Sequence, residues 1–150
     1  MTYTIDMLID KIKEVGKSYD LDKIQAAYEL AEKAHDGVFR SSGEPYITHP
    51  VAVAYILVEQ FCMDTDTICA ALLHDVVEDT DVGLDVIQKK FGEDVAHLVD
   101  GVTKIGQVPL NTREEQQAEN IRKILIAMSK DIRVIIIKLA DRLHNMRTMQ

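Results

Sequence analysis

Apolar residues recur at intervals of three and four along almost the entire chain, which is the spacing that places them on one face of an α-helix. No stretch alternates between apolar and polar residues for long enough to predict a β-strand. We therefore predict an all-α helical bundle that forms a single domain over residues 1–150. The predicted helices cover residues 5–15, 21–35, 49–61, 65–78, 83–91, 93–103, 113–128 and 132–150.

Residues with capping chemistry mark several of these helix ends. Asp20, Asp64 and Asp131 stand where an N-cap carboxylate would accept from the first free backbone N–H groups. Pro50 suits the first turn of a helix, because its missing N–H would have no partner there. This assignment puts His49 at the N-terminus of that helix, and we expect it to project from the helix end.

The segments between the predicted helices contain turn-forming residues. A polar loop over residues 36–48 carries two glycines and Pro45, and loops of this kind on a helical scaffold commonly carry function. Gly92 is expected to end the helix over 83–91.

The C-terminal helix keeps its apolar register at Met146 and Met149, where the sequence stops at Gln150 without a glycine cap or a polar tail. We therefore expect the domain to be incomplete at its C-terminal end and to belong to a longer protein.

Composition narrows the choice of partners and location. The chain is 47% hydrophobic and 28% charged, which is enough apolar material for one core. A net charge of −8 argues against binding to nucleic acid polymers, which requires a broad basic surface. No apolar run is long enough for a membrane span and residues 1–10 do not resemble a signal peptide, so a cytoplasmic location is predicted. Cys62 and Cys69 are expected to be reduced core residues.

The most informative residues are the adjacent pair His74 and Asp75, together with His49 and Asp141. Neighbouring histidine and aspartate side chains can both reach one metal ion. Two further ligands would complete a mixed nitrogen and oxygen site that suits Mn, Fe or Zn. This combination predicts a metallohydrolase.

Two further carboxylates follow on the same predicted helix. Glu78 and Asp79 lie three and four residues after Asp75, so the three side chains share one helix face. Like charges repel unless a cation neutralises them, which favours a metal at this place. Glu78 and Asp79 are therefore candidates for orienting or deprotonating a water molecule.

Polar residues beyond the proposed ligands could contact a substrate. Asn145 and Thr148 continue the strip that begins at Asp141, at the spacing of successive helical turns. The polar loop offers a guanidinium and two hydroxyl groups suited to stacking on a base and bonding its edge, those of Arg40, Ser41 and Ser42.

Each of these features has a simpler explanation when taken alone. A histidine-aspartate pair is common on protein surfaces, and Asp141 beside Arg142 could form an exposed ion pair worth under about 1 kcal/mol. The serine-rich loop could be only a turn. His35 and His97 align with no other candidate ligand, and His144 lies off the strip of Asp141 and Asn145, so none of the three is given a role. The functional hypothesis therefore depends on the features occurring together.

Four stretches of the sequence match the motifs of a known protein family and together cover nearly the whole chain: AHDGVFRSSGEPYITHP, AALLHDVVEDT, FGEDVAHLVDGVTKI and EEQQAENIRKILIAMSKDIRVIIIKLADRLHNMRTM. In these stretches the chain resembles the hydrolase domain of RelA/SpoT homologues, HD-domain metallophosphohydrolases that degrade the alarmone (p)ppGpp. The resemblance implies one Mn²⁺ ion with four ligands: His49, His74, Asp75 and Asp141.

The same resemblance assigns roles to the remaining candidates. Glu78 and Asp79 match the pair that marks hydrolytic competence. Arg40 would pack on the guanine, and Asn145 and Thr148 would help to hold the nucleotide. Ser41 departs from the family, in which a second basic residue often follows the arginine.

The implied reaction is Mn-dependent hydrolysis of the 3′-pyrophosphate of (p)ppGpp to GDP or GTP and pyrophosphate, in control of the stringent response. In bifunctional relatives a covalently linked synthetase domain follows the hydrolase domain, and we expect such a domain in a longer parent chain. Two alternatives remain open, an HD phosphohydrolase for another nucleotide and an inactive regulatory module.

Overall fold

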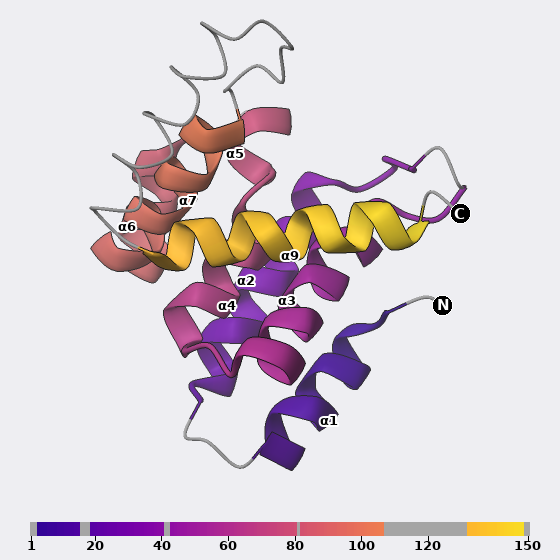
Figure 1. Ribbon diagram of the computed structural model, residues 1–150. Helices are drawn as coiled ribbons and strands as arrows, with labels where there is room; N and C mark the ends of the chain where they lie inside the picture. The colour runs from indigo at the N-terminus through magenta and orange to yellow at the C-terminus, as the bar shows by residue number, and fades with distance from the viewer. Residues whose placement is uncertain (1–2, 16–18, 41–42, 81, 107–131, 149–150) are drawn as a thin grey trace, which may run out of the picture.

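The polypeptide is helical in most of the parts that the computed structural model describes, which are residues 3–15, 19–40, 43–80, 82–106 and 132–148 (Figure 1). This confirms the all-α prediction. The helices are α1 (Ile5–Val15), α2 (Leu21–Ala34), α3 (Thr48–Phe61), α4 (Thr65–Leu73), α5 (Val76–Asp79), α6 (Leu84–Phe91), α7 (Glu93–Gly106) and α9 (Ile132–Thr148). The predicted helix over 113–128 and the predicted cap Asp131 lie outside the described residues.

The helix ends are set by the residues that the sequence indicated. The Asp20 carboxylate accepts from the backbone N–H of Lys23 at 3.1 Å and caps α2. Asp64 accepts from the N–H of Thr67 at 3.3 Å and caps α4. Gly92 follows α6 with φ of 100°, a backbone conformation that favours glycine, and the chain turns there into α7. These caps were predicted, and the structure confirms them.

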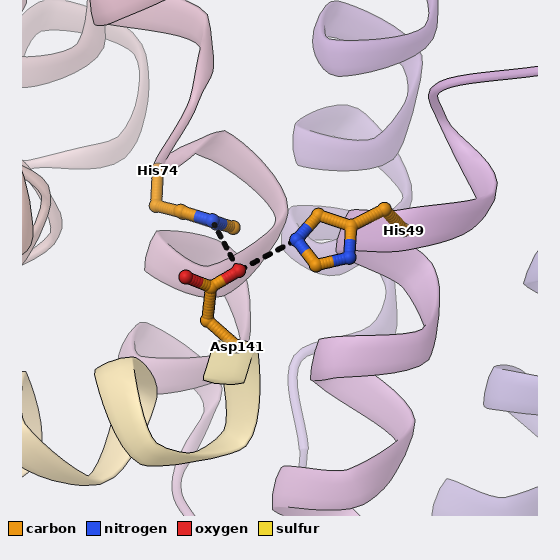
Figure 2. A group of neighbouring side chains, drawn as sticks. All are labelled: His49, His74 and Asp141. Atoms are coloured by element: carbon orange, nitrogen blue, oxygen red, sulfur yellow. Dashed lines mark hydrogen bonds and ion pairs between the residues drawn. The ribbon is translucent and has the colours of Figure 1, made fainter. Parts of the chain in front are cut away.

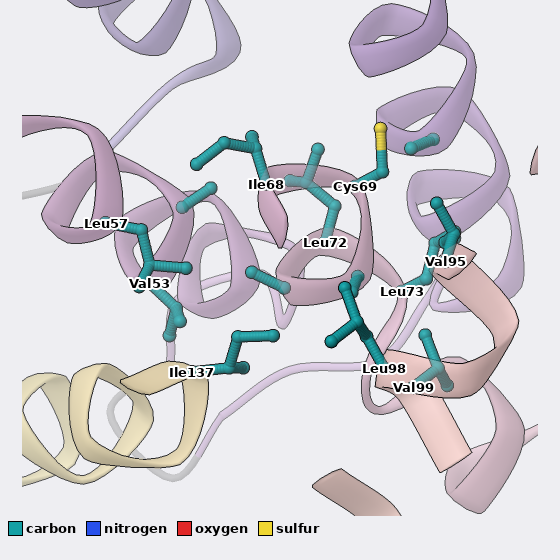
Figure 3. Close-up of a cluster of buried hydrophobic side chains, with 14 of the residues drawn as sticks. Val53, Leu57, Ile68, Cys69, Leu72, Leu73, Val95, Leu98, Val99 and Ile137 are labelled. Atoms are coloured by element: carbon teal, nitrogen blue, oxygen red, sulfur yellow. The ribbon is translucent and has the colours of Figure 1, made fainter. Parts of the chain in front are cut away.

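Helix α4 lies at the centre of the bundle and packs against α2, α3 and α7. Every residue from Thr67 to Leu73 is buried, so the burial extends to all faces of the helix and not to one face alone. The side chains drawn in Figure 3 show α3, α7 and α9 contributing to the same apolar cluster, which includes Leu57, Leu98 and Ile137. Burial of this many apolar groups is the main stabilising term of the fold.

The predicted helix over 65–78 is wrong in one respect, because the structure divides it. Helix α4 ends at Leu73, a turn contains His74 and Asp75, and the short helix α5 follows. The His74 Nδ1 atom donates to the Ala71 carbonyl at 2.5 Å. In a continuous helix this carbonyl would accept from the N–H of Asp75. The break therefore accompanies a side-chain hydrogen bond that a pattern of apolar residues does not report.

The cysteines are both free thiols, but only one of them belongs to the core. Cys69 is buried, and burial raises the pKa of its thiol to about 12. Cys62 is exposed and ends α3 in the left-handed conformation with φ of 49°, which corrects the expectation that it is a core residue. No helix among the described residues is long and apolar enough to span a membrane.

A glycine on α7 leaves room for the last helix, α9, to pack closely against the bundle. Helix α9 crosses over α3 and α4 and packs against α7, as Figure 1 shows. A Cβ atom on Gly101 of α7 would lie 2.7 Å from Cγ2 of Val134, which is buried on α9. The missing side chain at position 101 therefore allows the close approach of α7 and α9.

We expect Gly101→Ala to destabilise the fold despite its better helix propensity. The propensity gain is about 1 kcal/mol, whereas crowding against the stiff Val134 side chain costs about 1 to 3 kcal/mol. In a Val134→Ala background the crowding is removed, so the same substitution should become stabilising. Denaturant unfolding of the four proteins of this double-mutant cycle measures the coupling. Equal effects of G101A in both backgrounds would contradict the proposed contact.

Candidate metal centre

Side chains from three separate segments meet at one buried place. His49 is in the first turn of α3, His74 lies in the turn after α4, and Asp141 is on α9. Their candidate ligand atoms all lie within 4.8 Å of one another, and all three residues are buried (Figure 2). Asp141 Oδ1 is 2.6 Å from His49 Nε2 and 3.6 Å from His74 Nε2. A single cation could therefore contact all three residues.

The position of His49 corrects one expectation. It was predicted to project from the helix end, but its side chain is only 3% exposed and points toward α9. The reason is tertiary, because α9 crosses the N-terminal end of α3 and presents Asp141 to the ring.

Asp75 adjoins this cluster. Its Oδ2 atom is 3.1 Å from His74 Nε2 and accepts a hydrogen bond of 2.5 Å from the Tyr46 hydroxyl. Burial opposes ionisation of this carboxyl, but the nearby His74 charge and the hydrogen bond from Tyr46 lower its pKa to about 2. Asp75 is therefore a carboxylate held in place at the edge of the cluster. A fourth ligand that contributes an oxygen atom would need to be held in this way.

The His74 ring is oriented for metal binding. Its Nδ1 must carry a proton, because it faces the Ala71 carbonyl, which can only accept. Its buried Nε2 has no hydrogen bond of good geometry among the described residues, although it faces the carboxylates of Asp75 and Asp141. A neutral ring would direct a lone pair at two negative groups. A proton or a metal ion on Nε2 removes this repulsion, and metal-binding histidines commonly donate their other nitrogen to a carbonyl.

The electrostatics of the cluster favour a cation. Burial alone would lower the pKa of His74, but Asp75 and Asp141 raise it well above the ordinary value. Burial would raise the pKa of Asp141, yet the hydrogen bond from His49 and the nearby charge of His74 hold it far below its usual range. The Lys138 ammonium also contacts Asp141 Oδ2 at 3.1 Å. The carboxylates are therefore ionised, and without a metal His74 carries the balancing charge.

The two carboxylates predicted to act on water lie beside the cluster on α5. Glu78 and Asp79 are both exposed. Burial and the charges of Asp75 and Asp79 raise the pKa of Glu78. Glu78 is consequently a stronger base than an ordinary glutamate.

The predicted nucleotide contacts come together in part. The Arg40 Nη2 atom donates to Asn145 Oδ1 at 2.8 Å, so the loop after α2 reaches α9 next to the cluster. Arg40 Nη1 also lies 3.4 Å from both the His49 and the His144 Nδ1 atoms. Ser41, Ser42 and the Thr148 side chain lie outside the described residues.

Two histidines that were given no role from the sequence lie at this centre. His144 is buried with Nδ1 2.7 Å from His49 Nδ1, and burial, His49 and Arg40 lower its pKa to about 4. His35 is also buried, with Nε2 3.7 Å from Asp79 Oδ2 and its ring 4.7 Å from that of Tyr46. The signal for His144 was available, because it lies three residues after Asp141 and so shares its helix face. His97 is exposed, as expected for a residue without a role.

A family model described as an HD domain matches residues 27–150 of the chain.

The chain belongs to the HD-domain family.

Relatives of this HD domain are considerably longer proteins. The guanosine-3′,5′-bis(diphosphate) 3′-pyrophosphohydrolase of Vibrio cholerae is 51% identical over 146 residues, which cover 95% of this chain and 21% of the relative. The bifunctional (p)ppGpp synthase/hydrolase SpoT of Escherichia coli is 49% identical over 146 residues, which again cover 95% of this chain and 21% of the relative. The chain thus spans 21% of the length of these curated relatives.

A solved structure shows the same fold. It is that of a metazoan orthologue of SpoT, described as hydrolysing ppGpp and playing a role in starvation responses. The two superpose with a TM-score of 0.70 at 32% sequence identity, covering 87% of this chain and 72% of that chain.

The protonation state of His74 predicts how metal binding to this HD domain depends on pH. A raised pKa keeps its Nε2 protonated at neutral pH, and an ion must displace that proton. Below this pKa the apparent affinity for a divalent ion, with Mn²⁺ as the probe, should fall about tenfold per pH unit. Electron paramagnetic resonance titrations of free Mn²⁺, one pH unit either side of neutrality, would measure the slope. A pH-independent affinity would argue against His74 as a ligand.

Proposed function

We propose that this chain is the hydrolase part of a RelA/SpoT-type protein and hydrolyses the 3′-pyrophosphate of (p)ppGpp with Mn²⁺ in control of the stringent response. The observation that carries the proposal is the buried cluster of His49, His74 and Asp141, with Asp75 beside it. The names of the relatives support the choice of substrate; the matches cover 95% of this chain for the two curated proteins and 87% for the solved structure.

The donor set fits a single divalent ion. His49, His74, Asp75 and Asp141 offer two imidazole nitrogens and carboxylate oxygens, a set that suits Mn, Fe or Zn. When bound, such an ion lowers the pKa of a coordinated water and offsets the negative charge of a phosphorylated substrate. The acidic chain, with a net charge of −8, has special need of this second effect.

In the proposed reaction Glu78 takes a proton from the attacking water, which its raised pKa favours. The water oxygen forms a bond to the phosphorus that is attached to the 3′ oxygen of the ribose. The bond between this phosphorus and the 3′ oxygen breaks. The 3′ oxygen takes up a proton, and the products are pyrophosphate and GDP or GTP. Asp79 supports this role, because its negative charge contributes to the raised pKa of Glu78.

The nucleoside would lie on the side of the cluster where Arg40 and Asn145 meet. The hydrogen bond from Arg40 to Asn145 fixes the guanidinium plane, and a fixed plane can pack on the face of a guanine ring. Ser41, Ser42 and Thr148 are proposed to complete this contact.

We further propose that a synthetase domain is covalently linked to this hydrolase domain in a longer parent chain. The support comes from the Escherichia coli relative, which is named as both a synthase and a hydrolase and of which this chain covers only 21%.

Glu78→Gln should separate catalysis from metal binding. We expect kcat for pyrophosphate release from ppGpp to fall by about 10² to 10⁴, with Mn²⁺ affinity unchanged, because the amide cannot accept the proton. Asp75→Asn should instead weaken Mn²⁺ binding and turnover together.

The matched control is Glu93→Gln, an exposed glutamate at the start of α7, which should leave both quantities unchanged. Turnover of Glu78→Gln at the wild-type rate would refute its role. A wild-type chain that binds Mn²⁺ but releases no pyrophosphate from ppGpp would refute the proposed activity, and hydrolysis of a different nucleotide would reassign the substrate.

Arg40→Ala should act mainly on substrate binding. Loss of stacking worth about 1 to 2 kcal/mol predicts a KM for ppGpp raised about tenfold with a smaller change in kcat. Arg40→Lys keeps the charge but not the plane, so it should raise KM nearly as much. Arg142→Ala serves as the control, because Arg142 is an exposed arginine three residues before Asn145. An unchanged KM in both Arg40 variants would exclude the stacking role.

A further inference from the structure

His144 contacts His49 on the ring nitrogen that faces away from Asp141. The two Nδ1 atoms lie 2.7 Å apart, and both rings are buried. The ring centroids lie 5.0 Å apart and the ring planes are inclined by only 30°, so the two rings meet edge to edge through these nitrogens. Tyr3 packs its ring edge against His144 at 6.1 Å. His144 therefore contacts His49 on one side and Tyr3 on another, and these two contacts fix its position.

Two nitrogens at this distance share one proton, since two lone pairs or two N–H groups facing each other would repel. If His49 Nε2 binds a cation, that nitrogen supplies its lone pair and the proton of the neutral ring must be on Nδ1. This Nδ1–H then needs an acceptor, because a buried donor without a partner is costly.

Among the described residues, two groups lie within hydrogen-bonding distance of His49 Nδ1, and one of them can accept. The Arg40 guanidinium lies 3.4 Å away, but all its nitrogens are donors. His144 Nδ1 can accept when its own proton is on Nε2. Arg40 also lies 3.4 Å from His144 Nδ1, where its N–H groups favour a lone pair over an N–H.

We propose that His144 is a positioning residue, which accepts the hydrogen bond from His49 Nδ1 and so directs the His49 Nε2 lone pair toward the metal ion. The proposal rests on the proposed metal centre, and it assigns to α9 both a ligand, Asp141, and the partner that orients another ligand. Partners of this kind change metal affinity by about 10- to 100-fold when they are removed.

Three variants test the proposal through Mn²⁺ affinity, measured by electron paramagnetic resonance of the free ion. His144→Phe keeps an aromatic ring against Tyr3 but has no acceptor, and its affinity should fall about 10- to 100-fold. His144→Asn places an amide oxygen near the former Nδ1 and should recover most of that loss. His97→Phe changes an exposed histidine on α7 and should bind as the wild type does.

A second measurement needs no substitution and so does not depend on a variant that folds. Nitrogen-15 spectra of the histidine side chains of the wild-type chain, saturated with diamagnetic Zn²⁺, report which ring nitrogen carries the proton. We expect a protonated Nδ1 on His49 and an unprotonated Nδ1 on His144. The reverse assignment would overturn the proposal, as would wild-type Mn²⁺ affinity in a folded His144→Phe protein.

The outcomes also separate this inference from the proposed function. Weakened Mn²⁺ binding in His144→Phe with recovery in His144→Asn supports the role of His144 even if ppGpp proves not to be the substrate. A wild-type chain that binds no Mn²⁺ would refute the metal centre and the role of His144 together. Equal losses in the Phe and Asn variants would assign His144 to packing alone.

Discussion

The centre depends on the burial of one carboxylate between two imidazole rings. Asp141 is only 6% exposed, and a charge in that position is stable only when other groups compensate for its lost hydration. His49 and His74 provide this compensation on Oδ1, and Lys138 provides it on Oδ2. The same requirement makes the cluster receptive to a divalent cation, because such an ion offers the carboxylate more charge than a histidinium proton does.

The apolar core determines whether these charged groups can meet. Helix α4 is surrounded by α2, α3 and α7, so its C-terminal end has a fixed position, and His74 follows directly from it. Helix α9 must approach α7 closely for Asp141 to reach the same place, and Gly101 permits that approach. A rigid arrangement of the ligands is thus a consequence of close packing several turns away from them.

Much of this arrangement could be predicted from the sequence, because the signals were local or chemical. Aspartate caps and Gly92 mark helix ends through their own backbone partners, and the structure agrees with them. The residue types at positions 49, 74 and 141 indicated metal binding before their proximity was known. The break after Leu73 was missed because it involves a side-chain bond to a carbonyl, which leaves no trace in the apolar periodicity.

The positions of His35 and His144 beside the candidate site were missed for a different reason. Each histidine faces a residue that is distant in sequence, Asp79 in one case and His49 in the other, so these contacts cannot be read from spacing, although the spacing of His144 from Asp141 could have placed it at the centre. The orientation of His49 was predicted wrongly for the same reason, since it depends on how α9 crosses α3. Partners across helix interfaces require the three-dimensional structure.

The three segments that carry the candidate ligands are held together only in the folded chain, so an ion bound among them would act as a clamp between α3, the end of α4 and α9. An unfolded polypeptide cannot gather these groups, and binding therefore favours the native state by mass action. At a free ion concentration one hundred times Kd the gain is about 2.7 kcal/mol. With the proposed metal centre, metal supply and resistance to unfolding would be linked, and depletion of the ion would loosen the bundle at the place where its distant segments meet.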